Sequence, residues 1–225
     1  MQVFIFGAAR SAAIISNSEQ QLVLEKLLKG QRVLDWTLHG LRKAGIKDAQ
    51  ISFVGGYKVE QIISLYPELH YVINPKWEDT HVLGSLRYAM ESWKGGDMLL
   101  MYADTIFRPP VIANIIQSNS LVTIGTDSKW MERVSNPLKR HRAEKIIIKD
   151  EIVSSIGRET VMPDNADAQF SGLTLIKKEV AQKIFDGLHA EDDNEQFFGD
   201  NDSLTDLICL FIDHWNIPVT VYNQS

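Results

Sequence analysis

Small residues gather where the first apolar run of the chain ends. The run is "VFIF" from Val3 to Phe6, and the turn that follows consists of Gly7, Ala8, Ala9, Arg10 and Ser11. In a turn of such small residues, backbone N–H groups can approach phosphate oxygens, and the Arg10 guanidinium can add a positive charge. A tight turn packed under a helix uses the same residue types. The turn is therefore a candidate phosphate-binding loop, with a structural alternative.

A single carboxylate, Asp104, ends the apolar run "DMLLMYAD". A carboxylate at the end of a buried strand needs a partner, a hydrogen bond or a cation, because its desolvation is costly. Mg²⁺ commonly takes one or two carboxylates and fills its other positions with phosphate oxygens and water. Asp104 is thus a candidate Mg²⁺ ligand, and the alternative is an Asp that caps a helix or a turn.

A third polar segment, "INPKWEDTHVLGSL", follows another expected strand and leads into an expected helix. It contains Asn74, Thr80 and His81, and it ends with Ser85 and Leu86. Amide, hydroxyl and imidazole groups can hydrogen-bond to a base or a sugar. Thr80 or Asp79 would serve equally well as the N-cap of the following helix.

The elements that would position these residues alternate between two periodicities. Short apolar runs predict strands at 3–6, 50–56, 70–75, 97–104 and 121–127, and apolar residues at helical spacing predict helices at 32–46, 59–66, 82–93 and 108–118. This alternation predicts an α/β fold with a Rossmann-like, mostly parallel central sheet and helices on both faces. Ligands bind at the carboxyl ends of the strands in such a sheet, where the candidate segments lie.

The second half of the chain has a different character. Residues 128–168 mix charged, aromatic and proline residues, and include two short strands, 145–150 and 152–157, that predict an inserted hairpin flap. After it we expect a core strand at 170–176, a helix at 178–188, an acidic loop, a helix at 203–216 and a strand at 217–223.

Composition limits the class of protein. The chain has 225 residues, of which 44% are hydrophobic, so one α/β domain with an ample core is expected. The net charge of −6 argues against a nucleic-acid partner. The single cysteine, Cys209, lies in "LICLFI" and is expected to be a buried thiol with no disulfide or metal cluster. We expect neither secretion nor membrane insertion, and a cytoplasmic protein.

The order of these features resembles the small-molecule nucleotidyltransferases of the MobA-like, GT-A-like fold. The resemblance is strongest to the bacterial choline-phosphate and aminoethylphosphonate cytidylyltransferases, and it runs over nearly the whole chain. It rests on the segments 32–62, 71–86, 98–112, 126–133, 143–157 and 168–179. The resemblance divides a single domain, 1–225, into a nucleotide-binding core (1–127), an acceptor-side flap (128–168) and C-terminal core elements (169–225).

The resemblance implies a reaction. CTP would bind over the first loop, Mg²⁺ would bind Asp104, and an oxygen of a small phosphorylated or phosphonate acceptor would displace pyrophosphate from the α-phosphorus. Asp104 and Arg10 are the implied catalytic residues. The implied nucleotide contacts are Gly7, Ala8, Ala9, Arg10, Ser11, Gly56, Asn74, Thr80 and Ser85, and the implied acceptor contacts are Trp130 and Arg133. Neither nucleic acid nor a membrane is an expected partner, while a homodimer and a domain of a longer chain are both left open.

The chain departs from the family pattern at the triphosphate loop. Ala9 and Ser11 occupy positions where the family has glycines. Ala13 occupies the position of the basic residue that closes the family's loop, and Val23 occupies the position of a lysine further along the chain. The family's second metal-binding Asp lies in a segment that would begin at the end of this chain, and Asp200 or Asp202 of the acidic loop is a possible substitute.

Two functions therefore remain open. One is an active nucleotidyltransferase, and the other is a catalytically degenerate domain that binds a nucleotide or a partner or has a structural role. A third, a nucleotide-sugar glycosyltransferase, usually presents two acids spaced by one residue, whereas "YADT" contains one acid.

Overall fold

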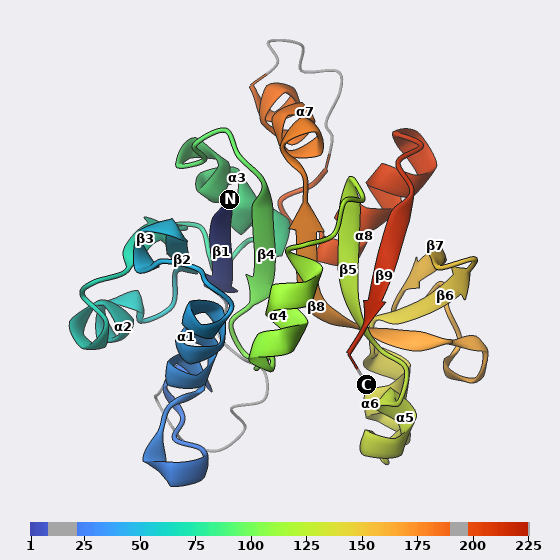
Figure 1. Ribbon diagram of the computed structural model, residues 1–225, viewed down its shortest axis with the longest axis horizontal. Coiled ribbons are helices and arrows are strands. Elements are labelled where there is room, and N and C mark those ends of the chain that lie inside the picture. The colour runs from blue at the N-terminus through green and yellow to red at the C-terminus, as the bar shows by residue number, and fades with distance from the viewer. Residues whose placement is uncertain (9–21, 190–197, 225) are drawn as a thin grey trace.

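A computed structural model of the protein describes residues 1–8, 22–189 and 198–224. Within these ranges, the strands form one nine-stranded sheet in the order β3-β2-β1-β4-β8-β5-β9-β7-β6 (Figure 1). The strands are β1 (Gln2–Gly7), β2 (Ile51–Gly55), β3 (His70–Ile73), β4 (Met98–Tyr102), β5 (Val122–Asp127), β6 (Lys145–Lys149), β7 (Ile152–Gly157), β8 (Ala168–Ile176) and β9 (Val219–Asn223).

The sheet consists of a parallel part and a mixed part. β3, β2, β1 and β4 are parallel neighbours, as are β5 and β9. β8 lies between β4 and β5 and is antiparallel to both. The hairpin expected near 145–157 is present as β6 and β7, and it joins the sheet through β6–β8 and β7–β9 pairing. The carboxyl ends of β1, β4 and β5 therefore lie at the same edge of the sheet.

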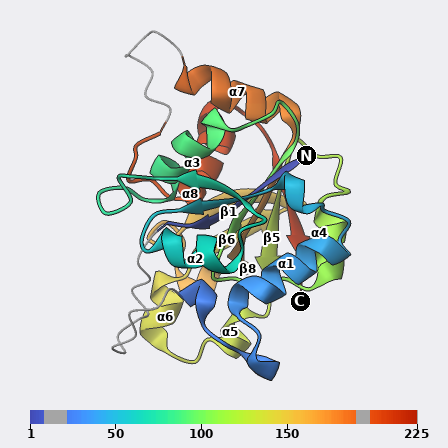
Figure 2. The ribbon, with the colours of Figure 1, turned by 90° about the vertical axis from the view of Figure 1, so that its left-hand side faces the viewer.

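Helices cover both faces of the sheet (Figure 2). α1 (Val33–Lys43), α2 (Val59–Leu65) and α4 (Pro109–Ile115) cover one face, and α3 (Val82–Glu91), α7 (Lys178–Leu188) and α8 (Leu204–Cys209) cover the other. The shorter elements are η1 (Leu22–Leu24), η2 (Leu28–Gly30), η3 (Asp48–Gln50), α5 (Trp130–Arg133), α6 (Pro137–Arg142), η4 (Pro163–Asn165) and the π-helical η5 (Leu210–His214).

Local sequence explains where α1 begins and which face it buries. The Asp35 carboxylate accepts a hydrogen bond from the Arg32 backbone N–H at 2.7 Å, which satisfies a donor ahead of the first turn. Leu34, Leu38 and Leu41 recur at helical spacing and are almost fully buried against the sheet. Each such leucine stabilises the fold by about 1.5–3 kcal/mol relative to an exposed one.

Two expectations from composition concern the burial of Cys209 and the presence of a membrane-spanning helix. Cys209 is only partly buried, and burial raises the pKa of its thiol to about 11. The thiol is therefore essentially protonated at neutral pH. Among the described residues, no helix combines the length and the apolar character needed to cross a membrane.

Candidate functional site

Asp104 lies at the carboxyl edge of the sheet, directly beyond the end of β4. The Ala103 backbone N–H donates to the Phe6 carbonyl oxygen at 3.0 Å, which keeps this segment beside β1 after the strand has ended. Asp104 itself is exposed, and the Thr105 hydroxyl lies 3.5 Å from its carboxylate. The expectation of a desolvated carboxylate was wrong, because the chain turns at 103–104 and carries the side chain out of the core. The exposed side chain is accessible to a ligand.

The first loop is described only at its start. Gly7 ends β1 and Ala8 is buried, whereas Ala9, Arg10, Ser11 and Ala13 lie outside the described residues. The Ala8 carbonyl oxygen accepts a hydrogen bond from the Tyr57 N–H at 2.9 Å. A Cβ on Gly56 would lie 2.9 Å from that carbonyl oxygen and 2.4 Å from Trp77 Cβ. Gly56 therefore allows the segments after β1, β2 and β3 to pack together.

Asn74 organises the loop between β3 and α3 from inside. Its side chain is fully buried, and the amide nitrogen donates to Thr80 Oγ1 and Ser85 Oγ, both at 2.9 Å. The amide oxygen accepts from the Lys76 N–H at 2.9 Å. α3 begins after His81, so neither Thr80 nor Asp79 is its N-cap. The structure gives Asn74, Thr80 and Ser85 a role in shaping this loop, while a contact of theirs with a nucleotide stays a prediction.

The segment 198–202 packs against the start of α3. The Asp200 carbonyl oxygen accepts from the His81 N–H at 2.8 Å and from the Gly84 N–H at 3.2 Å. Arg87 Nε donates to the Asp200 carboxylate at 2.6 Å and its Nη2 donates to the Phe198 carbonyl oxygen at 2.7 Å. Asp200 is thus paired with a cation of the protein. Asp202 Oδ2 accepts the Gly199 N–H at 2.6 Å, so this carboxylate stabilises its own turn.

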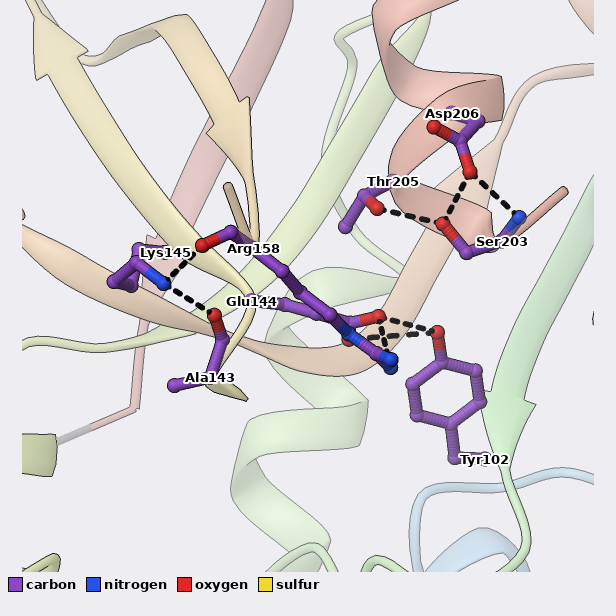
Figure 3. A network of polar contacts seen from close by, with 8 residues as sticks. All are labelled: Tyr102, Ala143, Glu144, Lys145, Arg158, Ser203, Thr205 and Asp206. Carbon is purple, nitrogen blue, oxygen red and sulfur yellow. Dashed lines mark hydrogen bonds and ion pairs between the residues drawn. The ribbon is translucent and has the colours of Figure 1, made fainter. Parts of the chain in front are cut away.

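A polar network joins the end of β4 to the two ends of the β6–β7 hairpin (Figure 3). The Tyr102 hydroxyl donates to Glu144, with oxygens 3.4 and 3.5 Å away, and Arg158 Nη2 lies 3.1 Å from Glu144 Oε1. The Glu144 side chain is 8% exposed, whereas that of Arg158 is 59% exposed. Burial raises the pKa of Glu144, and the Arg158 charge partly opposes this effect. The network therefore presents an exposed guanidinium that is anchored by a buried carboxylate.

Tyr102 links this network to Asp104. Burial, followed by the charge of Glu144, raises the pKa of Tyr102 well above its ordinary value, and the Asp104 charge adds to the effect. The phenol is neutral at physiological pH and acts as a hydrogen-bond donor. The charges of an exposed anion, Asp104, and an exposed cation, Arg158, consequently both act on one partly buried tyrosine.

Lys145 holds the hairpin that supplies Glu144. Its side chain is fully buried, and its ammonium donates to the carbonyl oxygens of His141, Ala143 and Arg158 at 2.6, 2.9 and 2.5 Å. Two of these contacts appear in Figure 3. Burial lowers the pKa of Lys145. The ammonium joins the end of α6 to the end of β7 and so fixes the base of the network.

The two predicted acceptor residues have different environments. Trp130 is 1% exposed and is among the largest fully buried side chains, so its expected contact with an acceptor was wrong. An indole of this size at the start of a short helix is more favourable in the core than in water. Arg133 is exposed and forms an ion pair with Asp127. Among the described residues, no three His, Cys, Asp or Glu side chains cluster closely enough to hold a metal ion by themselves.

Sequence reasoning missed Tyr102, Glu144 and Arg158. Tyr102 carried a weak signal, because a hydroxyl interrupts an apolar strand two residues before Asp104. Glu144 precedes the first strand of the hairpin, where an acid commonly lies in solvent. The expected hairpin brings positions 144 and 158 to its open end, where Lys145 pairs with Gly157, but nothing in the local sequence indicates that Glu144 is buried there.

Comparisons with known proteins bear on the fold. The chain matches no protein-family model and no curated protein. It is similar to the structure of the inositol-1-phosphate CTP transferase from T. maritima, with a TM-score of 0.72, 14% identity, and coverage of 99% of this chain and 84% of that one. It is also similar to a protein assigned as a glucose-1-phosphate thymidylyltransferase from Bacillus anthracis, in complex with a sucrose, with a TM-score of 0.76, 12% identity, and coverage of 100% and 87%. The chain therefore has the α/β fold of these nucleotidyltransferase structures, and the predicted fold class is confirmed.

Proposed function

We propose that this protein is a nucleotidyltransferase that transfers CMP from CTP to a small phosphorylated or phosphonate acceptor. The observation that carries the proposal is the exposed carboxylate of Asp104 directly beyond the carboxyl end of β4, two residues after the Tyr102 whose hydroxyl donates to the Glu144 that anchors the exposed Arg158. Both features lie at the sheet edge where open α/β sheets bind ligands. CTP and the choline-phosphate or aminoethylphosphonate class of acceptor are favoured by the resemblance in sequence, and one neighbour in structure is a CTP transferase.

The proposed reaction needs positioning and charge neutralisation more than proton transfer. An acceptor oxygen attacks the α-phosphorus of CTP and forms a new P–O bond. The α–β phosphoanhydride bond breaks, and its electron pair leaves with pyrophosphate. Arg158 would donate hydrogen bonds to the phosphate or phosphonate oxygens, and Glu144 would hold the guanidinium in place. Arg10 stays a prediction as a second cation, since it lies outside the described residues.

A magnesium ion fits the residues present. Asp104 is exposed, and within residues 1–8, 22–189 and 198–224 its carboxylate contacts only the Thr105 hydroxyl, at 3.5 Å, which leaves oxygen positions for a metal ion. Mg²⁺ is commonly bound by a single protein carboxylate when phosphate oxygens and water occupy its other coordination positions. Asp104 would hold the ion, which when bound neutralises negative charge on the triphosphate. Asp200 is paired with Arg87 and is a poorer candidate.

Nucleotide binding and turnover test the proposal in two stages. Thermal shift with each of the four nucleoside triphosphates, with and without Mg²⁺, should show the largest stabilisation with CTP and Mg²⁺. Pyrophosphate release is then measured with phosphocholine and with aminoethylphosphonate as acceptors. Turnover with either acceptor supports the enzyme, and the absence of stabilisation by every triphosphate refutes nucleotide binding.

Two variants locate the reaction at the proposed edge. Asp104→Asn should abolish the Mg²⁺ dependence of CTP binding, while the exposed Asp213→Asn on η5 should leave it unchanged. Arg158→Gln should lower kcat/KM by about a hundredfold, as expected for a lost charge contact to the reacting phosphates. Arg42→Gln removes an exposed arginine of α1 and serves as its control. Unchanged metal dependence in Asp104→Asn would show that another carboxylate is responsible.

The second candidate function is a domain that binds a nucleotide or a partner without turnover, or that has a structural role. Ala9, Ser11 and Ala13 favour it, because the loop lacks two glycines and a cation at the family positions. The burial of Trp130 also favours it, since no aromatic face there is available to an acceptor. Stabilisation by CTP without pyrophosphate release would support this function over the enzyme.

A further inference from the structure

A cleft of about 350 Å³ opens between the segment after β4 and the start of α5. Its lining includes Phe107, Arg108 and Val111 on one side and Asp127, Lys129 and Arg133 on the other. α4 and α5, which border it, can be followed in Figure 1. Asp104, Tyr102, Glu144 and Arg158 do not line the cleft. Phe107 and Val111 belong to the core under α1 and α4, whereas Tyr102 packs on the opposite core.

The lining of the cleft is cationic although the chain as a whole is acidic. Three basic side chains face one acidic side chain in the cleft, against a net charge of −6 for the protein. The acid is already engaged: Asp127 pairs with Arg133 and accepts the Lys129 backbone N–H at 2.9 Å. Its side chain is 16% exposed, and that of Arg133 is 57% exposed. The accessible charge is therefore positive.

The Asp127 ion pair orients Arg133 toward a ligand. A guanidinium carries five N–H donors in a rigid fork, and one carboxylate engages only some of them. Because the Arg133 side chain is more than half exposed, its other donors can reach a ligand in the cleft. A planar fork held in this way suits the bidentate hydrogen bonding of a phosphate or phosphonate.

Arg108 and Lys129 add charge without internal compensation. Both side chains are exposed, and neither has an ion-pair partner within residues 1–8, 22–189 and 198–224. Like charges facing one cleft repel each other, and a bound anion relieves that repulsion. The buried Phe107 and Val111 give the cleft an apolar floor, which strengthens charge interactions by excluding water on one side.

We propose that this cleft is a second binding site, at the same sheet edge as Asp104 but lined by other residues, for the dianionic group of a phosphomonoester or a phosphonate. The three cations and the volume suit a group of that charge on a small molecule. The site does not depend on nucleotidyl transfer: a phosphorylated ligand would bind here whether or not the Asp104 edge is catalytic.

Direct binding to the whole chain tests the cleft. Inorganic phosphate and methylphosphonate are titrated by isothermal calorimetry at low ionic strength, with sodium chloride as the monovalent control. Arg133→Gln, Lys129→Gln and Arg108→Gln should each weaken phosphate binding about fivefold to tenfold, the effect of one charge at contact distance in a partly hydrated cleft. Lys149→Gln removes an exposed lysine at the end of β6 and should leave the affinity unchanged. Circular dichroism confirms that each variant is folded.

The same variants separate this site from the proposed active site. Asp104→Asn and Arg158→Gln should retain phosphate binding, because neither residue lines the cleft. Lys129→Gln also distinguishes two sources of the bound phosphate. If the phosphate of the acceptor occupies the cleft, the variant raises the KM for the acceptor. If a separate phosphorylated ligand occupies the cleft, the variant lowers the affinity for phosphate and leaves the KM for the acceptor unchanged. The proposal is overturned if the wild-type protein binds no phosphate up to about 10 mM, or if binding is lost in Arg158→Gln and retained in the cleft variants.

Discussion

Replacing Gly172 should destabilise the protein by forcing Tyr102 out of its place in the polar network. Gly172 lies in β8 with φ +81°, and a Cβ there would lie 2.2 Å from Tyr102 Cδ2 and 2.8 Å from its Cγ. The ring cannot move freely, because it packs edge-on against Phe170 and donates to Glu144. Gly172→Ala therefore combines a backbone penalty with a steric one.

The magnitude follows from these two terms. An alanine in the left-handed region costs about 1–2 kcal/mol relative to glycine. Overpacking a core position by one carbon typically costs about 1–3 kcal/mol more. Together they predict a loss of about 2–5 kcal/mol in the free energy of unfolding, a large fraction of the stability of a domain.

A matched control isolates the steric term. Gly95 has φ +79°, and a Cβ there meets nothing within 4 Å, so Gly95→Ala carries the backbone penalty alone. Urea unfolding monitored by circular dichroism should show Gly172→Ala to be less stable than Gly95→Ala by about 1–3 kcal/mol. Equal losses in the two variants would refute the claim that Tyr102 is immobile. Nucleotide-dependent stabilisation should also weaken in Gly172→Ala alone, because Tyr102 precedes Asp104 at the sheet edge.

Three further predictions concern buried or paired charges. Burial raises the folded-state pKa of Glu144 above its ordinary value of 4.5, so its contribution to stability is present below pH 4.5 and is lost as pH rises through the raised pKa. The free energy of unfolding of the wild type minus that of Glu144→Gln should therefore fall as pH rises above about 4.5 and then level off. Lys145→Met should cost about 2–4 kcal/mol in urea unfolding, because three carbonyl oxygens lose the donor that the buried ammonium provides. Arg87→Ala should speed hydrogen exchange of the Gly84 amide by about tenfold, because the segment that carries Asp200 loses its anchor to α3.

Each of these predictions has a contrary outcome. A pH-independent difference between the wild type and Glu144→Gln would mean that burial does not govern the Glu144 pKa. A Lys145→Met variant no less stable than the exposed Lys149→Met would mean that the ammonium is dispensable. Unchanged exchange at Gly84 in Arg87→Ala would show that backbone hydrogen bonds alone hold segment 198–202.

Most of the fold could be predicted because its signals are local. The apolar runs that end at Phe6 and Tyr102 are buried on both faces, as parallel strands require, and the leucines of α1 recur at helical spacing. Strand direction is not a local property. The run at 170–176 was recognisable as a core strand, yet nothing in it indicated that β8 would enter the sheet antiparallel between β4 and β5.

The candidate site could be predicted only in part. Asp104 was recognisable because a polar residue that ends an apolar run marks the carboxyl edge of a sheet. Trp130 was misassigned because an aromatic residue among charges resembles a binding residue until its burial is known. From the sequence, Asp200 was a candidate metal ligand in an acidic loop. In the structure its carboxylate is paired with Arg87.

Local patterns along the chain were enough to predict the periodicity of the elements, the sheet edge at which polar residues follow strands, and the lack of the family glycines at Ala9 and Ser11. Tertiary structure alone decided which charges are paired. It buried Glu144 under Arg158, enclosed the Lys145 ammonium in carbonyl oxygens, and left Asp104 exposed. The physical reason is that side-chain periodicity acts over a few residues, whereas desolvation and charge pairing depend on segments that folding brings together from distant parts of the chain.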